Sequence, residues 1–202
     1  MSSGRRVEIR KQRRLFDDFF KVDEVVVAYQ RYDGSMSGDE RRLVFERGDA
    51  VGVLLFDADT RSVVLVEQFK LPGLIGRRRD DPATNDGWIT ELAAGMIDEG
   101  ETAEQAVIRE AFEETGYRVS DPKLIGKFFS SAGGTSERFF LYFARASEAE
   151  RQARGGGLAG EEDIKVFAVG VDELFARLAR GVIEDPKLAI GAYWLKDNID
   201  RL

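Results

Sequence analysis

The chain has 202 residues, a formal net charge of −7, and neither histidine nor cysteine. Its length suits one domain of ordinary size, or a domain with an extension. Without these two residue types, a Ser-His-Asp triad, a thiolate nucleophile, a disulfide and a His- or Cys-ligated metal are all excluded. A metal site in this chain therefore uses oxygen ligands, which suits Mg²⁺, Mn²⁺ or Ca²⁺.

Charge and hydropathy also limit the partners. The acidic balance argues against a nucleic-acid partner held by general phosphate attraction. No apolar run approaches the roughly 20 residues of a membrane helix, so we expect no membrane partner. The basic start of the chain lacks the apolar region of a signal peptide, and the absence of cysteine permits a reducing compartment. We therefore predict a cytoplasmic protein.

The first fifth of the chain predicts a β-hairpin. Residues 1–20 are polar and basic and predict a short amphipathic or frayed start. Residues 21–29, with three consecutive valines, and residues 41–46 have strand composition. The polar connection between them is too long for the tightest hairpin turn. Because an isolated hairpin is only marginally stable, it should pack on the main domain or on another subunit.

The rest of the chain mixes strands and helices. The apolar residues 50–56 predict a central strand covered on both faces, residues 62–69 predict the next strand, and residues 71–87 predict a polar loop with three adjacent arginines. Further strands are expected at 88–92, 123–130, 138–144 and 164–171, and helices at 147–154, at 172–180 and from Pro186 onward. This order lacks strict βαβ alternation, which favours a mixed sheet between helices.

The acidic stretch from Gly95 to Tyr117 predicts a helix over residues 102–115, capped by Thr102 and Gly116. Its small apolar residues line a packing face, and three glutamates lie on a second face: Glu110, Glu113 and Glu114. Like charges at this spacing destabilise an isolated helix by roughly 0.2–0.5 kcal/mol per pair, and a divalent cation would remove that penalty. Arg109 can brace the face by pairing with one carboxylate. The plainer alternative is a solvated acidic face.

The spacing of this stretch resembles the signature of the Nudix hydrolases, which outweighs the plainer alternative. The residues that carry the resemblance are Gly95, Glu101, Arg109, Glu110, Glu113, Glu114 and Gly116. Ala111 and Tyr117 depart from the family pattern, which has branched aliphatic residues there. Both are packing positions, so the departures do not affect the predicted chemistry.

The resemblance implies a fold and a chemistry. The fold is α/β, an α/β/α sandwich around a mixed sheet, with the motif as loop–helix–loop. The chemistry is Mg²⁺-dependent, or Mn²⁺-dependent, hydrolysis of a nucleoside diphosphate linked to another group. The implied metal ligands are Glu110, Glu113, Glu114 and the backbone carbonyl of Ala94. Glu101 would orient the motif, and Arg109 and Glu113 would belong to the catalytic group.

Blocks between Phe45 and Leu195, among them VEQFK, WITELAAGMIDEGE and SSAGGTSER, resemble the ADP-ribose pyrophosphatases and a similar branch that acts on GDP-mannose. We therefore predict a homodimeric enzyme that cleaves ADP-ribose to AMP and ribose 5-phosphate. GDP-mannose or another nucleotide sugar is an alternative substrate. A noncatalytic nucleotide-sensing module is an alternative from another class. An RNA-processing enzyme is disfavoured by the acidic charge.

Residues outside the helix are expected to choose the substrate. By the same resemblance, the substrate-binding residues are Arg42, Lys70, Glu137, Gly133 and Gly134. Lys70 stands where ADP-ribose enzymes often have arginine, and lysine cannot offer a two-pronged donor. Gly133 and Gly134 could instead form a plain turn.

Two acidic residues in a glycine-rich loop complete the predicted site. By the same resemblance, Glu161 or Glu162 would supply a base, and Glu162 could also add a metal ligand. A solvated charge pair is the alternative. For the domains, we predict residues 1–48 as a β-extension exchanged between subunits and residues 49–202 as the Nudix domain. The alternative is an edge hairpin on its own subunit.

Overall fold

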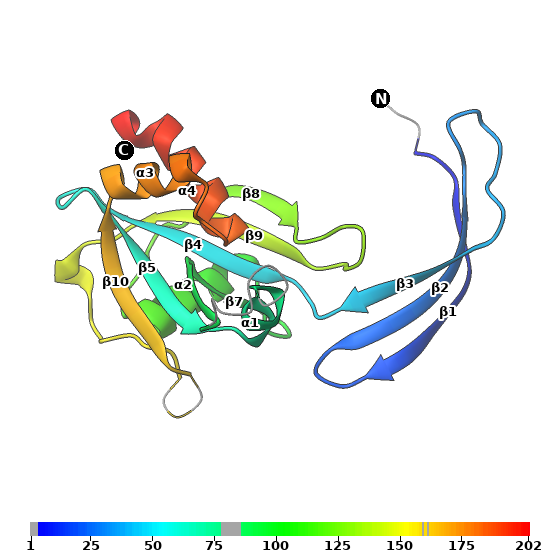
Figure 1. Cartoon of the computed structure of the whole chain (residues 1–202), viewed down its shortest axis with the longest axis horizontal. Coiled ribbons are helices and arrows are strands. Elements are labelled where there is room, and N and C mark those ends of the chain that lie inside the picture. The colour runs from blue at the N-terminus through cyan, green and yellow to red at the C-terminus, as the bar shows by residue number, and fades with distance from the viewer. Residues whose placement is uncertain (1–3, 78–85, 159, 161) are drawn as a thin grey trace. The chain divides into compact units, whose positions relative to one another are not determined.

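The structure is a computed structural model that describes residues 4–77, 86–158, 160 and 162–202. The chain forms two compact units (Figure 1). Residues 1–49 and 129–138 make up the N-terminal unit, and residues 50–128 and 139–202 make up the second unit. Each unit is described by itself below.

The N-terminal unit contains a three-stranded antiparallel sheet in the order β1-β2-β3. The strands are β1 (Val7–Asp17), β2 (Lys21–Tyr29) and β3 (Glu40–Glu46). The predicted hairpin is confirmed, because β2 pairs with β3 from Lys21↔Glu46 to Val27↔Glu40. The prediction of a frayed start was wrong, because β1 is an 11-residue strand that pairs with β2 along its length.

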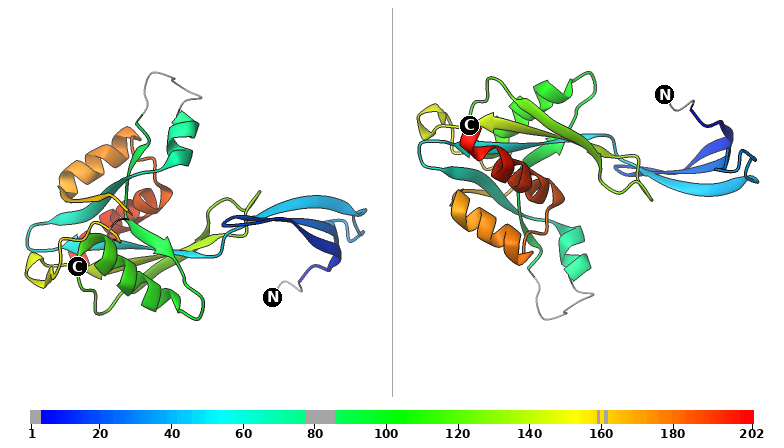
Figure 2. Two further views of the ribbon diagram at one scale, coloured as in Figure 1. Left: turned by 90° about the horizontal axis from the view of Figure 1, so that it is seen from below. Right: turned by 90° about the horizontal axis from the view of Figure 1, so that it is seen from above.

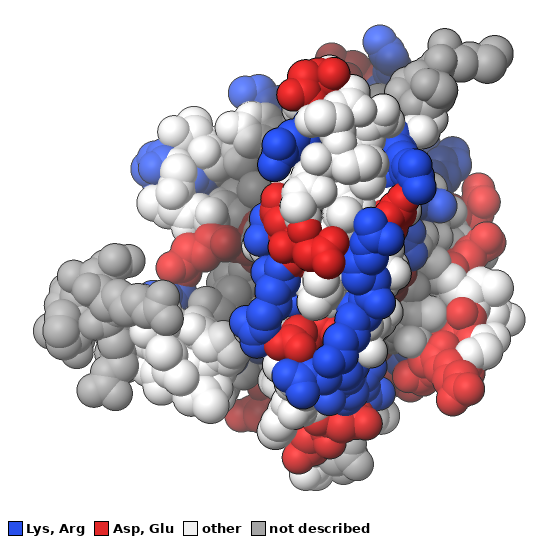
Figure 3. All heavy atoms as spheres, turned by 90° about the vertical axis from the view of Figure 1, so that its right-hand side faces the viewer, with Lys and Arg blue, Asp and Glu red and all other residues white. Residues whose placement is uncertain are grey.

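Cross-strand ion pairs explain why the basic start of the chain is ordered. Arg13 of β1 and Arg41 of β3 both donate to the Glu24 carboxylate in the middle strand, and Arg14 donates to Asp23. Figure 3 shows rows of Lys and Arg side chains beside Asp and Glu side chains on the face it presents. Opposite charges on neighbouring strands stabilise a sheet. A sequence pattern cannot show this pairing, because the partners are at least nine residues apart.

The second unit contains a seven-stranded mixed sheet in the order β10-β5-β4-β9-β8, with β6 paired to β5 and β7 paired to β4. The strands are β4 (Ala50–Asp57), β5 (Ser62–Phe69), β6 (Trp88–Glu91), β7 (Ala93–Met96), β8 (Lys123–Phe129), β9 (Arg138–Arg145) and β10 (Ile164–Gly170). β4 and β9 are parallel, whereas β4 and β5 are antiparallel. The single strand predicted at 88–92 is in fact two strands, β6 and β7, which pair with different neighbours.

Helices cover both faces of this sheet (Figures 1 and 2). Helix α2 (Ala103–Thr115) packs on one face, where Val53 and Leu55 of β4 join its core cluster. Helices α3 (Val171–Arg180) and α4 (Pro186–Asn198) pack on the other, with Leu54 and Phe56 of β4. Successive residues of a strand point to opposite faces, so β4 contributes to both clusters. The α/β/α sandwich predicted from the family resemblance is confirmed.

Three local features complete the unit. Helix α1 (Leu71–Arg77) lies where a polar loop was predicted; Pro72 falls in its first turn, where proline is tolerated. Arg78 and Arg79, in the same predicted loop, lie outside the described residues. The predicted helix at 147–154 was wrong, since only a 3₁₀ turn, η1 (Glu148–Glu150), forms there. A second 3₁₀ turn, η2 (Ile199–Arg201), ends the chain. Nowhere in the described ranges is a helix long and apolar enough to cross a membrane.

Candidate active site

Helix α2 presents the acidic face, and its two ends are fixed by local chemistry. At the start, the Thr102 hydroxyl accepts a hydrogen bond from the Gln105 backbone N–H, and the Gln105 side chain accepts one from the Thr102 N–H. At the end, Gly116 adopts a left-handed conformation with φ 79°. Ala106, Val107 and Ala111 are buried on its inner face. The predicted caps and packing face are therefore confirmed.

Glu114 is the most deeply buried carboxylate of the helix, with 3% of the residue exposed. Its Oε2 accepts a hydrogen bond from the Ala94 N–H at 2.9 Å, and its Oε1 accepts one from Gln68 Nε2 at 3.5 Å. Burial raises the pKa of Glu114 to about 8, opposed by the Ala94 hydrogen bond and assisted by the charges of Glu110 and Glu91. Both hydrogen-bond partners are neutral, so within the described part of the chain this carboxylate has no full counter-charge in direct contact.

Glu110 lies against β7 at Gly95. A Cβ atom at Gly95 would overlap the Glu110 carboxylate, so a larger residue there would displace this carboxylate from its present position. Burial raises the pKa of Glu110, the Arg109 hydrogen bond lowers it, and the charges of Glu113 and Glu162 raise it further.

Arg109 orders this face through several contacts. It bonds both carboxylate oxygens of Glu101, at 3.0 and 2.8 Å, and one oxygen each of Glu110, at 2.6 Å, and Glu113, at 3.1 Å. It also donates to the Met96 carbonyl at 3.0 Å. These carboxylates raise the pKa of Arg109, with the Glu101 hydrogen bond the largest cause. The sequence predicted one carboxylate partner, whereas among the described residues Arg109 bonds three carboxylates and also lies 3.7 Å from Oδ2 of a fourth, Asp98.

The glycine-rich loop is attached to the end of helix α2. The Gly156 N–H donates to the Glu114 carbonyl at 2.8 Å, and the Gly157 N–H donates to the Glu113 carbonyl at 3.1 Å. The Glu162 carboxylate accepts a bond from the Leu158 N–H at 3.0 Å. The backbone thus connects the segment bearing Glu162 to the helix that bears the other glutamates. Glu161 lies outside the described residues.

Lys70 belongs to a cluster of polar side chains that the sequence did not predict. Its Nζ lies 3.3 Å from Oε1 of Glu91, a residue of β6 that is 7% exposed. Gln68 Nε2 donates to the same oxygen at 3.0 Å, and Lys187 Nζ lies 3.4 Å from Oε2. A charged residue inside the short strand 88–91 is the signal that could have pointed to Glu91. Lys187 could not have been found in this way, because it begins a distant helix.

The other predicted substrate residues lie in the N-terminal unit. Arg42 is on β3, where it pairs with Glu40. The Glu137 carboxylate accepts a bond from the Ser130 hydroxyl at 3.0 Å and lies 3.7 Å from Arg47 Nε. Gly133 and Gly134 lie in the turn between Ser130 and Glu137, and a Cβ atom on either would meet open space. Nothing in the packing of this turn requires glycine, so their predicted contact with substrate stays a prediction.

Comparison with known proteins agrees with this geometry. Residues 46–189 match the family model described as NUDIX domain. The chain belongs to the Nudix hydrolase family. An ADP-ribose pyrophosphatase of Escherichia coli (strain K12) is 35% identical over 94% of this chain and 88% of that protein. A GDP-mannose pyrophosphatase of Cronobacter sakazakii is 32% identical over 91% of this chain and 92% of that protein.

A solved structure supports the fold. The chain titled "Crystal structure of ADP compounds hydrolase" superposes with a TM-score of 0.66 at 16% identity, and the alignment covers 98% of each chain. At this identity the likeness concerns the architecture alone. It agrees with the sandwich of helices and mixed sheet described above.

The Nudix helix suits a divalent cation although its carboxylates are engaged by arginine. Among the residues that the structure describes, no three acidic side chains form a ready-made metal site. Arg109 instead joins Glu110 and Glu113. Glu114, which is buried, and Glu110, which is partly buried, nevertheless offer hard oxygen donors, and Gly95 leaves the space that Glu110 occupies. Oxygen donors of this kind fit Mg²⁺ or Mn²⁺.

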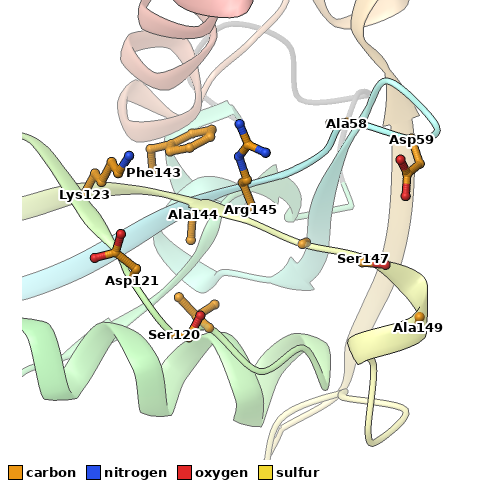
Figure 4. Close-up of a pocket in the computed structure, with 12 residues that line it drawn as sticks. Ala58, Asp59, Ser120, Asp121, Lys123, Phe143, Ala144, Arg145, Ser147 and Ala149 are labelled. Carbon is orange, nitrogen blue, oxygen red and sulfur yellow. The ribbon is translucent and has the colours of Figure 1, made fainter. Parts of the chain in front are cut away.

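A pocket elsewhere in the second unit, called the Nudix unit below because it bears the Nudix motif, is unrelated to this chemistry. It has a volume of about 660 Å³ and is lined by the turn after β4, the segment after α2 and the end of β9 (Figure 4). Its polar side chains include Asp59, Asp121, Lys123 and Arg145. None of the predicted site residues lines it, so the acidic helix face, not this pocket, is the candidate active site.

Proposed function

We propose that this Nudix hydrolase cleaves the pyrophosphate bond of ADP-ribose, giving AMP and ribose 5-phosphate, in a reaction that depends on Mg²⁺. The observation that carries the proposal is the acidic face of α2, where Arg109 pairs with Glu110 and Glu113 and the neighbouring Glu114 is buried. The substrate class follows from the ADP-ribose pyrophosphatases that match at 35% identity over most of the chain.

The side chains of helix α2 have two roles in this proposal, metal binding and the orientation of the metal ligands. Glu110, Glu113 and Glu114, with the Ala94 carbonyl, are the groups that would hold Mg²⁺ or Mn²⁺. Such an ion supplies charge neutralisation at a diphosphate and lowers the pKa of a bound water. Arg109 fixes the direction of Glu110 and Glu113.

Two further groups act around this centre. Glu162, or its neighbour Glu161, accepts a proton from the attacking water. Lys70 offers a positive charge to a phosphate oxygen, and we assign Arg42, Glu137 and the Gly133-Gly134 turn to contacts with the rest of the substrate.

GDP-mannose is the second candidate substrate. Lys70 favours this substrate, because it stands where the ADP-ribose enzymes often have arginine. A lysine ammonium acts as a point charge and cannot make the bidentate contact of a guanidinium. The 32% identical GDP-mannose pyrophosphatase supports the same alternative. Both substrates contain the same type of bond, so the acidic face serves either reaction.

We further propose a homodimer, in which residues 1–48 form an extension exchanged between subunits and residues 49–202 form the Nudix domain. Exposed apolar side chains in the N-terminal unit support an interface: Val7 is 61% exposed, Ile9 63%, Phe16 54% and Phe19 77%. Several large apolar groups exposed on one small sheet are typical of a contact surface. A cytoplasmic location belongs to the same proposal.

A substrate panel tests the function. Purified protein is incubated with ADP-ribose, GDP-mannose and other nucleoside diphosphate sugars, with Mg²⁺ or Mn²⁺, and the phosphate-ester products are quantified. We expect the highest kcat/KM with ADP-ribose. Turnover of GDP-mannose alone would overturn the substrate assignment. No turnover of any diphosphate would favour a noncatalytic nucleotide-sensing role.

A further inference from the structure

A line of buried polar groups joins helix α4, on one face of the sheet, to the glutamates of helix α2, on the other. It begins at Lys187 in the first turn of α4, whose side chain is 18% exposed. The Lys187 ammonium lies 2.7 Å from Asp185 Oδ1 and 3.4 Å from Glu91 Oε2. Its aliphatic part passes Gly52 of β4, where a Cβ atom would lie 3.2 Å from Lys187 Cδ.

The line continues through Glu91 to the metal-binding face. Oε1 of Glu91 accepts a bond from Gln68 Nε2 at 3.0 Å, and the same nitrogen reaches Oε1 of Glu114 at 3.5 Å. The Gln68 amide therefore lies between two buried carboxylates. An amide nitrogen has two hydrogens and can donate to both, whereas the amide oxygen would be repelled by either. Glu91 thus helps to decide which way the Gln68 amide points toward Glu114.

Glu91 has two ammonium partners with different freedom. Lys187 is mostly buried, whereas the Lys70 side chain is 42% exposed, and its Nζ lies 3.3 Å from Oε1 of Glu91. A buried carboxylate that loses its counter-charge is strongly destabilised. Lys70 can leave Glu91 for a phosphate only if another positive charge stays behind, and Lys187 supplies that charge.

The capping of α4 does not account for Lys187. Asp185 caps the helix by accepting a bond from the Leu188 N–H at 2.9 Å through Oδ2, which is not the oxygen nearest Lys187. A purely apolar side chain would fill the space beside Gly52 without burying a charge, which is costly unless the charge is paired. The contacts that distinguish lysine from an apolar residue at this position are those of its ammonium with Asp185 and with Glu91, and the contact with Glu91 is the one that leads toward helix α2.

We propose that Lys187 is a positioning residue of the active site: through Glu91 it holds the Gln68 amide toward Glu114 and leaves Lys70 free to turn to the substrate. The proposal rests on the proposed function, since it concerns the same metal-binding face. It predicts that the charge of Lys187, on helix α4, controls the affinity for metal of the glutamates on helix α2. Groups that orient metal ligands commonly change affinity or activity 10–100-fold when removed.

The test compares four proteins in full-length form. Lys187→Met removes the charge and keeps the length of the side chain. The double variant Lys187→Met/Glu91→Gln also removes the Glu91 charge that has lost Lys187. The side-chain amide oxygen introduced at position 91 can still accept a hydrogen bond from Gln68. Lys165→Met is the matched control, since Lys165 also pairs with a glutamate on β5, Glu67, at 3.3 Å, but is 69% exposed. Each is compared with the wild type.

Three quantities are measured for each protein. They are the dissociation constant for Mn²⁺ without substrate, by electron paramagnetic resonance, the Tm without metal, and kcat and KM with Mg²⁺. We expect Lys187→Met to weaken Mn²⁺ binding about 10–100-fold, the double variant to recover most of that loss, and the control to stay within twofold of the wild type. A purely structural ion pair would lower the Tm and leave the affinity of the folded protein for Mn²⁺ unchanged.

The outcomes separate this proposal from the proposed function. A Mn²⁺ affinity within twofold of wild type in folded Lys187→Met, or a double variant no better than the single one, overturns the positioning role. If Lys187→Met does not fold, Gln68→Met breaks the same line at its other end and must give the same loss of affinity. A wild type that binds Mn²⁺ but hydrolyses no diphosphate overturns the proposed function alone, because the affinity measurements need no substrate.

Discussion

Single residues on helix α2 show how the site combines burial with charge. Glu114 is almost fully buried, and its two hydrogen-bond donors, the Ala94 N–H and the Gln68 amide, are both neutral. The Glu110 carboxylate occupies the space that a side chain at position 95 would take, and it pairs with Arg109. A buried carboxylate with neutral partners, as Glu114 is, is unfavourable in a protein that has no ligand to bind. Its cost is understandable if the site receives a cation.

Replacement of Glu114 by glutamine tests this reasoning at the residue scale. The substitution keeps the shape and removes a buried charge, so the metal-free protein should be at least as stable as the wild type. Turnover should fall at least ~100-fold, because a charged ligand of the reaction centre is lost. The rise in Tm that Mg²⁺ gives the wild type should shrink or disappear. Kinetics and thermal unfolding with and without Mg²⁺ measure all three.

Exposed Glu99 provides the comparison, since Glu99→Gln changes the same functional group on the same motif. This control should retain turnover and the response to Mg²⁺. Near-normal activity of Glu114→Gln would refute the metal assignment.

Among the elements, the glycine-rich loop after η1 depends most on close backbone contact. Gly155 has φ 68°, and a Cβ atom there would lie 2.5 Å from the Glu114 carbonyl oxygen. The neighbouring N–H groups of Gly156 and Gly157 bond the last carbonyls of helix α2. These contacts tie the loop that bears Glu162 to the end of helix α2, so the loop serves as a helix cap and, in the proposed function, also supports the base.

Gly155→Ala should therefore weaken both stability and catalysis. The strained conformation and the backbone overlap are expected to cost ~1–3 kcal/mol. Turnover should fall more than KM changes, because Glu162 is displaced while Lys70 is not. Urea unfolding and steady-state kinetics measure the two effects. Gly38→Ala is the control, since its Cβ would meet no atom within 4 Å. Unchanged kinetics in a destabilised Gly155→Ala protein would show that the loop does not position a catalytic group.

The N-terminal sheet gives a prediction for pH. Hydrogen bonds from Arg13 and Arg41 lower the pKa of Glu24 to about 2. A carboxylate with a lowered folded-state pKa stabilises the fold above its unfolded pKa of about 4.5, and this contribution is lost as the pH falls toward 2. Glu24→Gln should thus have a lower urea midpoint than the wild type at pH 6, and the difference should shrink steadily below pH 4.5. A difference that stays constant from pH 6 to pH 2 would contradict the ion-pair account.

Which elements the sequence could predict depended on whether their cause was local. The caps of α2 at Thr102 and Gly116 follow from residues within one turn, and both were predicted correctly. Strand β1 depends on Asp23 and Glu24 of the next strand, and residues 147–154 are held by bonds such as Gln152 N–H to the Gly116 carbonyl. Those partners are distant in the chain, so patterns of composition gave a frayed start and a helix instead.

The same distinction applies to the site. The acidic face of α2 could be predicted because its glutamates repeat at helical spacing within five residues, whereas their role as metal ligands stays a prediction. Gln68 lies on β5, Glu91 on β6 and Lys187 on α4. Only folding brings Gln68 Nε2 within 3.0 Å of one Glu91 oxygen and Lys187 Nζ within 3.4 Å of the other. No local pattern marks such a network in advance.

At the scale of the whole molecule, the proposed dimer makes the N-terminal sheet part of the enzyme. Ile9 lies on β1, an edge strand of its sheet, and is 63% exposed. An exposed edge strand with apolar side chains is a liability unless another surface covers it. A second copy of the chain would provide that surface, and the proposed exchange would bring Arg42 of one subunit to the substrate of the other.

Ile9→Lys should then shift the protein from dimer to monomer, because the lysine charge would be buried against an apolar surface. Light scattering on a sizing column measures the mass, and kcat/KM should fall together with the dimer fraction. Val182→Lys is the control, since Val182 is 56% exposed in the Nudix unit. A wild type that is monomeric and fully active at low concentration would contradict the exchanged arrangement. The N-terminal sheet would then cover only its own subunit, and residues of that subunit alone would have to select the substrate.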